Sequence, residues 1–94
     1  MCMNERLEAR VRGRVQMVMY RDFAARSARR LKLVGEVQNL SDGSVRVVAE
    51  GPRAALERFV TRLRKGSLLA RVDDMQLSWK PAEHTYRSFT ITYD

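Results

Sequence analysis

Apolar and polar residues alternate in five segments of the chain, a pattern typical of β-strands that bury one face. The clearest case is residues 7–15, where apolar residues or glycine occupy every second position and charged residues stand between them. Shorter segments of the same kind cover residues 36–40, 44–50, 75–79 and 89–93. The sequence therefore predicts four or five strands.

Two further segments carry apolar residues at helical spacing. In the first, residues 22–32, the apolar face is formed by Phe23, Ala24, Ser27, Ala28 and Leu31. The second helix is expected to open at Gly51-Pro52 and to stop at Gly66, with an apolar stripe of Leu56, Phe59, Val60 and Leu63.

The order of these elements predicts the fold. Asp42-Gly43 lies between the second and third strands, as in a tight hairpin. Strand, helix, strand, strand, helix, strand is the split βαβ, ferredoxin-like α+β arrangement. We expect an antiparallel sheet of four to five strands with both helices on one face, in a single domain over residues 1–94.

Composition narrows the class of protein. Hydrophobic residues make up 45% of the 94 residues, which is enough for a core and argues against intrinsic disorder. No stretch is long and apolar enough to span a membrane or to form a signal peptide, so we expect a soluble, cytoplasmic protein. The single cysteine, Cys2, excludes an internal disulfide, and the lone His84 excludes standard zinc spacings.

The net charge is +7, and most of the excess is arginine. A basic surface attracts nucleic acid, an anionic membrane surface or a small phosphorylated substrate, and charge alone does not choose among them. The commonest role of such charges on a helix is solvation of its outer face.

Candidate chemistry lies between the first strand and the first helix. A loop that feeds a helix N-terminus points backbone N–H groups outward and favours anions. Arg21 stands where this helix begins, and its planar guanidinium can hold two phosphate oxygens together. Gly13 would allow close backbone approach to a ligand. On these residues alone, Arg21 could equally be an ordinary surface arginine.

The same segment resembles a known family signature. Gly13-x-Val15-Gln16-x-Val18-x-Tyr20-Arg21 is similar to the acylphosphatase motif Gly-x-Val-Gln-Gly-Val-x-Phe-Arg. The similarity continues in order through nearly the whole chain, at Gly35-x-Val37-x-Asn39, Asp42-Gly43-Ser44-Val45, Glu50-Gly51, Ala70-Arg71-Val72 and Phe89-Thr90-Ile91.

The resemblance implies hydrolysis of the carboxyl–phosphate bond of acyl phosphates, without metal or cofactor. It implies that Asn39 positions the attacking water and that Arg21 binds the phosphoryl group together with its loop. That phosphate-binding loop comprises Val15, Gln16, Met17, Val18, Met19, Tyr20 and Arg21. The expected partners are a small acyl phosphate and phosphate or other anions. We expect a monomer that does not associate with a membrane.

Two methionines depart from the family pattern. Met17 replaces the usual glycine, and Met19 stands where a small or aromatic residue is common. If position 17 requires positive φ, methionine costs about 1 to 2 kcal/mol of strain there or shifts the loop. One alternative is therefore a weakened or inactive relative that binds anions or a partner. The other is a basic nucleic-acid-binding module, which is disfavoured because the strands lack the stacking aromatic residues of RNA-binding sheets.

Overall fold

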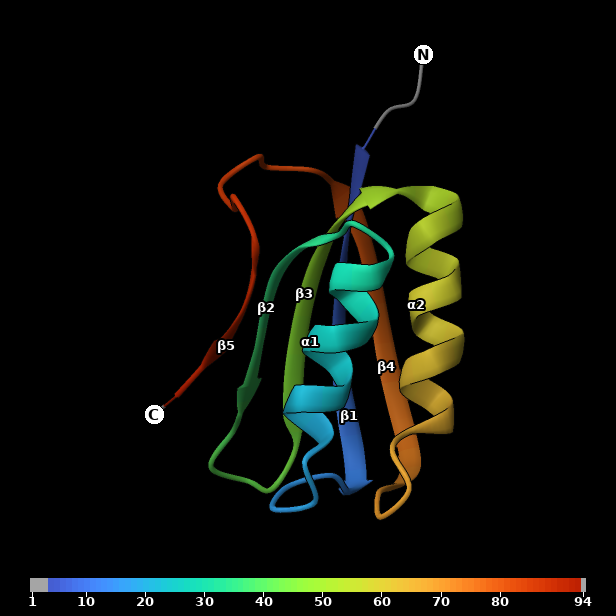
Figure 1. Cartoon of the computed structure of the whole chain (residues 1–94), viewed down its shortest axis with the longest axis vertical. Coiled ribbons are helices and arrows are strands. Elements are labelled where there is room, and N and C mark those ends of the chain that lie inside the picture. Colours follow the sequence, from blue (N-terminus) through green and yellow to red (C-terminus); the bar gives the residue numbers. More distant parts are fainter. Residues whose placement is uncertain (1–3, 94) are drawn as a thin grey trace.

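A computed structural model describes residues 4–93 of the chain, so Cys2 lies outside the described residues. The elements follow the predicted order, and their bounds are β1 Asn4–Arg14, α1 Tyr20–Arg30, β2 Val34–Asn39, β3 Val45–Pro52, α2 Arg53–Lys65, β4 Arg71–Pro81 and β5 Phe89–Thr92. The five strands form one sheet in the order β4-β1-β3-β2-β5. Both helices cover the same face of this sheet, as predicted (Figure 1).

The expectation of an antiparallel sheet is wrong at one edge. β5 pairs with β2 in parallel, with Gly35 opposite Phe89 and Val37 opposite Ile91, whereas the other pairs of neighbouring strands are antiparallel. β4 and β5 lie at opposite edges of the sheet, so the connection between them crosses the sheet before β5 begins. β5 therefore runs opposite to β4 and in the same direction as β2.

The core lies between the sheet and the two helices. In the middle of β1 and β3, every second residue faces the helices and is buried, as the alternation predicts; these residues are Leu7, Ala9, Val11, Val45, Val47 and Ala49. Phe59 of α2 packs edge-on against Phe89 of β5, with ring centroids 5.9 Å apart. This contact joins the second helix to the strand at the sheet edge.

A buried carboxylate holds the connection between β4 and β5. Glu50 of β3 is 2% exposed and accepts hydrogen bonds from the backbone N–H groups of Glu83 (2.9 Å) and His84 (3.1 Å). Arg6 of β1 lies 3.3 Å from the same carboxylate through Nη1. Glu50 thus fixes the start of the segment that leads to β5.

Removing this carboxylate should destabilise the protein. We expect Glu50→Ala to lower the free energy of unfolding by about 3 kcal/mol, because two backbone N–H groups and the buried Arg6 charge lose a partner. Chemical denaturation measures the change. Glu57→Ala is the control, since its ion pair with Arg53 is exposed and contributes little. Equal losses in the two variants would contradict the role given to Glu50.

Candidate functional site

The loop between β1 and α1 alternates buried and exposed side chains. Val15 and Val18 are buried in the core, whereas Met17 and Met19 point outward. Both methionines have left-handed backbone conformations, with φ of 60° and 62°. Alternation of left-handed and ordinary residues turns successive N–H groups toward one side and forms a concave anion site. This loop leads directly into the N-terminus of α1, whose dipole also favours an anion.

Position 17 does have positive φ in this structure, and methionine adopts it. Met17 is 99% exposed, so its side chain packs against nothing that would offset the strain. We expect Met17→Gly to raise the free energy of unfolding by about 1 kcal/mol, because glycine adopts this conformation without steric cost. Met17→Ala keeps the Cβ atom and should leave stability unchanged. Equal stabilisation by alanine and glycine, measured by denaturation, would rule out backbone strain as the cause.

Three side chains anchor the loop to its surroundings. Gln16 Nε2 donates hydrogen bonds to the backbone oxygens of Leu40 and Ser44, each 2.8 Å away at the β2–β3 hairpin. Ser67 Oγ donates to the Val18 oxygen at 3.3 Å. The buried Tyr20 hydroxyl donates to the Leu63 oxygen at 2.8 Å, and burial raises the pKa of this phenol. The loop is thereby tied to both the hairpin and α2.

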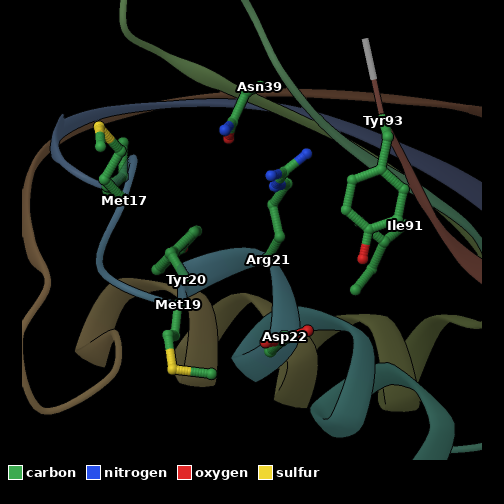
Figure 2. Close-up of a pocket in the computed structure, with 9 residues that line it drawn as sticks. Met17, Met19, Tyr20, Arg21, Asp22, Asn39, Ile91 and Tyr93 are labelled. Atoms are coloured by element: carbon green, nitrogen blue, oxygen red, sulfur yellow. The ribbon is translucent and has the colours of Figure 1, made fainter.

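The Arg21 side chain is held by Thr92 and Tyr93, the last two residues that the structure describes. Its Nη1 donates to the backbone oxygen of Thr92 at 3.2 Å, and its guanidinium stacks on the Tyr93 ring at 4.9 Å. In Figure 2 the guanidinium lies between Asn39 and Tyr93. The remaining N–H donors of Arg21 are thus available on the side of Asn39.

Asn39 enters the site from the last position of β2. Asn39 shares with Val37 the sheet face that the helices cover. It lies at the end of the strand, outside the core and beside the N-terminus of α1. Its Oδ1 is buried and has no hydrogen-bond partner among residues 4–93. Figure 2 shows its side chain pointing into the space in front of Arg21. A buried acceptor of this kind requires a donor, and a bound water is the simplest one.

These side chains surround a pocket of about 360 Å³. Its lining includes most of the predicted site, namely Val15, Met17, Met19, Tyr20, Arg21 and Asn39. Gln16 and Val18 are not part of the lining, because Gln16 turns to the hairpin and Val18 packs in the core. Both residues hold the loop in place without lining the pocket.

Gly13 does not have the role expected of it. It lies within β1, at a bulge in the pairing with β4, and has φ of 133°. A Cβ atom there would stand 2.1 Å from the Arg71 backbone oxygen. Glycine is needed for close approach of two strands and not for approach of a ligand.

Sequence reasoning missed three residues of the lining: Asp22, Ile91 and Tyr93. The alternation of residues 89–93 places Ile91 and Tyr93 on one face of the strand, and this pattern is the sequence signal that could have grouped them. Only the parallel pairing of β5 with β2 brings that face beside Asn39.

Within the part of the chain that the structure describes, no three His, Cys, Asp or Glu side chains gather as a metal-ion site would require. No helix among residues 4–93 has the length and apolar character needed to cross a membrane.

Comparisons with known proteins agree with this geometry. A family model described as Acylphosphatase matches residues 7–91. A protein named Acylphosphatase from Salinibacter ruber is 44% identical over 87 residues, which is 93% of this chain and 92% of the relative. One from Thermus thermophilus is 53% identical over 74 residues, covering 79% of this chain and 84% of the relative.

Solved structures show the same fold. The crystal structure of acylphosphatase from Bacillus subtilis superposes with a TM-score of 0.92 at 36% sequence identity. The match covers 95% of this chain and 99% of that one.

Proposed function

Because this chain belongs to the acylphosphatase family and is a hydrolase acting on acyl phosphates, we propose that Arg21 and its loop bind the phosphoryl group while Asn39 positions the attacking water. The observation that carries this proposal is the buried Asn39 Oδ1, which lacks a partner among the described residues and lines the same pocket as Arg21.

The division of labour follows from the chemistry of each group. The loop N–H groups, the α1 N-terminus and the Arg21 guanidinium offer positive charge to the equatorial phosphoryl oxygens, where negative charge concentrates in the transition state. Asn39 Oδ1 accepts a hydrogen bond from water and so orients its lone pair toward phosphorus. An amide is too weak a base to remove the proton of this water.

The reaction needs little further help. Water oxygen bonds to phosphorus, the bond from phosphorus to the acyl oxygen breaks, and the carboxylate leaves with the electron pair. The water proton passes to a phosphoryl oxygen of the substrate. The leaving carboxylate has a pKa of about 4 to 5, so no strong general acid is required. Positioning and charge stabilisation therefore carry the rate, and we propose that no metal takes part.

Benzoyl phosphate hydrolysis in excess chelator tests the proposal. We expect turnover to persist with chelator present, and inorganic phosphate to inhibit it competitively because it occupies the same loop. Turnover that is lost with chelator and restored by a divalent cation would contradict the metal-free mechanism. Phosphate binding without any turnover would instead indicate an inactive relative.

The conformation at position 17 argues against that inactive alternative. The loop keeps the left-handed residues that form its concave side although methionine replaces glycine at position 17. We expect the strain at position 17 to lower stability, as the Met17→Gly variant tests. A cytoplasmic location, a monomeric state and the assignment of residues 1–94 to one domain stay predictions of the sequence.

A further inference from the structure

The outer surface of the two helices carries cations that the active site does not use. Two adjoining hollows of about 460 and 190 Å³ lie between α1 and α2 and share Phe23 and Arg62. We call this surface the helix groove; its charged lining residues are Arg26, Arg30, Arg58, Arg62 and Lys65. The helices lie side by side on the face of the molecule turned to the viewer in Figure 1.

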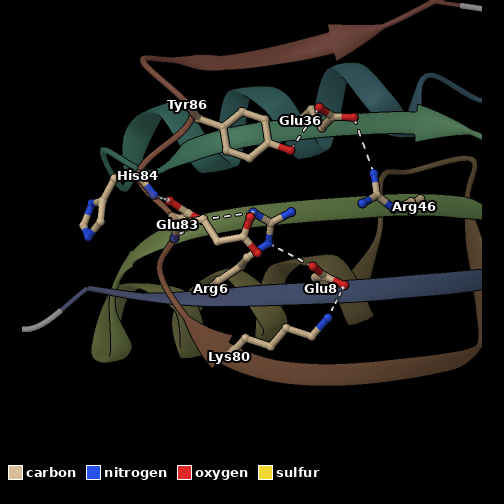
Figure 3. A network of polar contacts seen from close by, with 9 residues as sticks. Arg6, Glu8, Glu36, Arg46, Lys80, Glu83, His84 and Tyr86 are labelled. Carbon is tan, nitrogen blue, oxygen red and sulfur yellow. Dashed lines mark hydrogen bonds and ion pairs between the residues drawn. The ribbon is translucent and has the colours of Figure 1, made fainter.

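In the described part of the chain, the groove cations lack the carboxylate partners that arginines on the open face of the sheet have. On the open face of the sheet, Arg6, Arg10 and Arg46 each form an ion pair with a carboxylate (Figure 3 shows Arg6 and Arg46). Among the described residues, the five groove cations make no side-chain hydrogen bond or ion pair, and their side chains are exposed. No carboxylate lines either hollow. Within residues 4–93, Arg12, Arg14, Lys32, Arg64 and Arg87 also lack such partners, but the groove brings five unpartnered cations together with no carboxylate in its lining.

The arrangement of these cations suits an extended anion. Arg26 and Arg30 are one turn apart on α1, and Arg58 and Arg62 are one turn apart on α2, so each pair is spaced by about 6 Å along its helix. Cations in two rows do not converge on one point, as they would around a single phosphate ion. They match a chain of charges that runs along the groove.

The polarity of the surface decides the class of partner. A protein partner or a membrane would require exposed apolar anchors. The exposed large apolar residues of the described chain are Met17, Met19, Leu68, Leu69 and Tyr93, and none of them lies on the outer face of α1 or α2. Interfaces with nucleic acid are polar and strongly basic, and arginine suits phosphate oxygens especially well.

We propose that the helix groove binds nucleic acid through its phosphate backbone, independently of base sequence. The absence of stacking aromatic residues from the strands disfavours RNA binding on the open face of the sheet only. The helix groove lies on the opposite side of the molecule and contacts phosphates, which requires no stacking ring. This binding is separate from the hydrolysis of acyl phosphates.

Fluorescence anisotropy with a labelled single-stranded DNA of about 20 nucleotides, and with the matching duplex, measures the binding. If five cations each neutralise one phosphate, the affinity for the single strand should fall about 100-fold between 50 and 200 mM salt. Sequence changes in the oligonucleotide should have little effect. No binding at 50 mM salt, or binding of inorganic polyphosphate without binding of either DNA, would overturn the proposal.

Paired charge removal locates the site. For the single strand, Arg30→Gln combined with Arg62→Gln should reduce the slope of log affinity against log salt by about 1.4 and weaken binding about 10-fold or more. Arg10→Gln combined with Arg46→Gln removes the same charge from the other face and should change the affinity less than about threefold. Equal losses in both double variants would show a general charge effect and overturn the proposal.

Two further measurements separate this surface from the active site. The groove variant should keep its benzoyl phosphate turnover, which also shows that it folds. Arg21→Ala should keep its DNA affinity, and a loss as large as that of the groove variant would assign DNA binding to the active-site loop instead. Because the anisotropy measurement requires no turnover, its failure leaves the proposed catalytic roles untouched, and their failure leaves the DNA result interpretable.

Discussion

Replacing Arg21 by alanine should lower kcat/KM for benzoyl phosphate by about 10³ or more, in line with the contribution of arginines that stabilise phosphoryl transfer. The guanidinium donates to the Thr92 oxygen and stacks on the Tyr93 ring, so its orientation does not depend on the substrate. Such preorganised charge acts in the transition state without further rearrangement.

Arg26→Ala is the matched control for this variant. It removes the same charge from the same helix, about one turn further on, outside the pocket lining. We expect its kcat/KM to stay close to that of the natural protein at moderate salt. Inhibition by inorganic phosphate should weaken strongly in Arg21→Ala and not in Arg26→Ala. Equal rates for the two variants would show that Arg21 does not bind the phosphoryl group.

Replacing Asn39 by alanine should have the second largest effect. We expect kcat to fall by about 10²-fold, because a water that is no longer oriented reaches the attacking position less often. The inhibition constant of inorganic phosphate should change less than about twofold, since the loop and Arg21 remain in place. The expected signature is therefore a loss of rate at constant phosphate affinity.

Gln38→Ala is the control for the asparagine variant. Gln38 is the neighbour of Asn39 in β2, and its side chain points to the opposite face of the sheet, away from the pocket. It should leave both kcat and phosphate inhibition unchanged. An Asn39→Ala protein with normal kcat and weakened phosphate binding would reassign Asn39 from water positioning to phosphate binding.

The sequence predicts the elements of this fold well where the signal is local. Alternation in β1 and β3, the apolar stripes of both helices and Asp42-Gly43 each reflect contacts that neighbouring residues make with one core. The parallel pairing of β5 with β2 has no such local signal. It depends on a connection that crosses the sheet and is held by Glu50, which lies more than thirty residues earlier in the chain.

The same distinction applies to the site. Arg21 and Asn39 could be placed through the motifs around them, and their side chains do line one pocket. Tyr93 and Ile91 lie in a segment that the sequence does predict as a strand, but they reach that pocket through its parallel pairing with β2, which the sequence does not predict. Gly13 was misread because a glycine beside a loop can serve either a ligand or a neighbouring strand, and only the register with β4 distinguishes the two.

The central claim is that water, oriented by Asn39, attacks the phosphorus atom of an acyl phosphate bound on the Arg21 loop. Hydrolysis of benzoyl phosphate in ¹⁸O-labelled water, followed by mass spectrometry of both products, tests it most directly. Attack at phosphorus places the label in inorganic phosphate and leaves benzoate unlabelled. Enzyme-dependent label in benzoate would show attack at the carbonyl carbon and contradict the roles given to both residues.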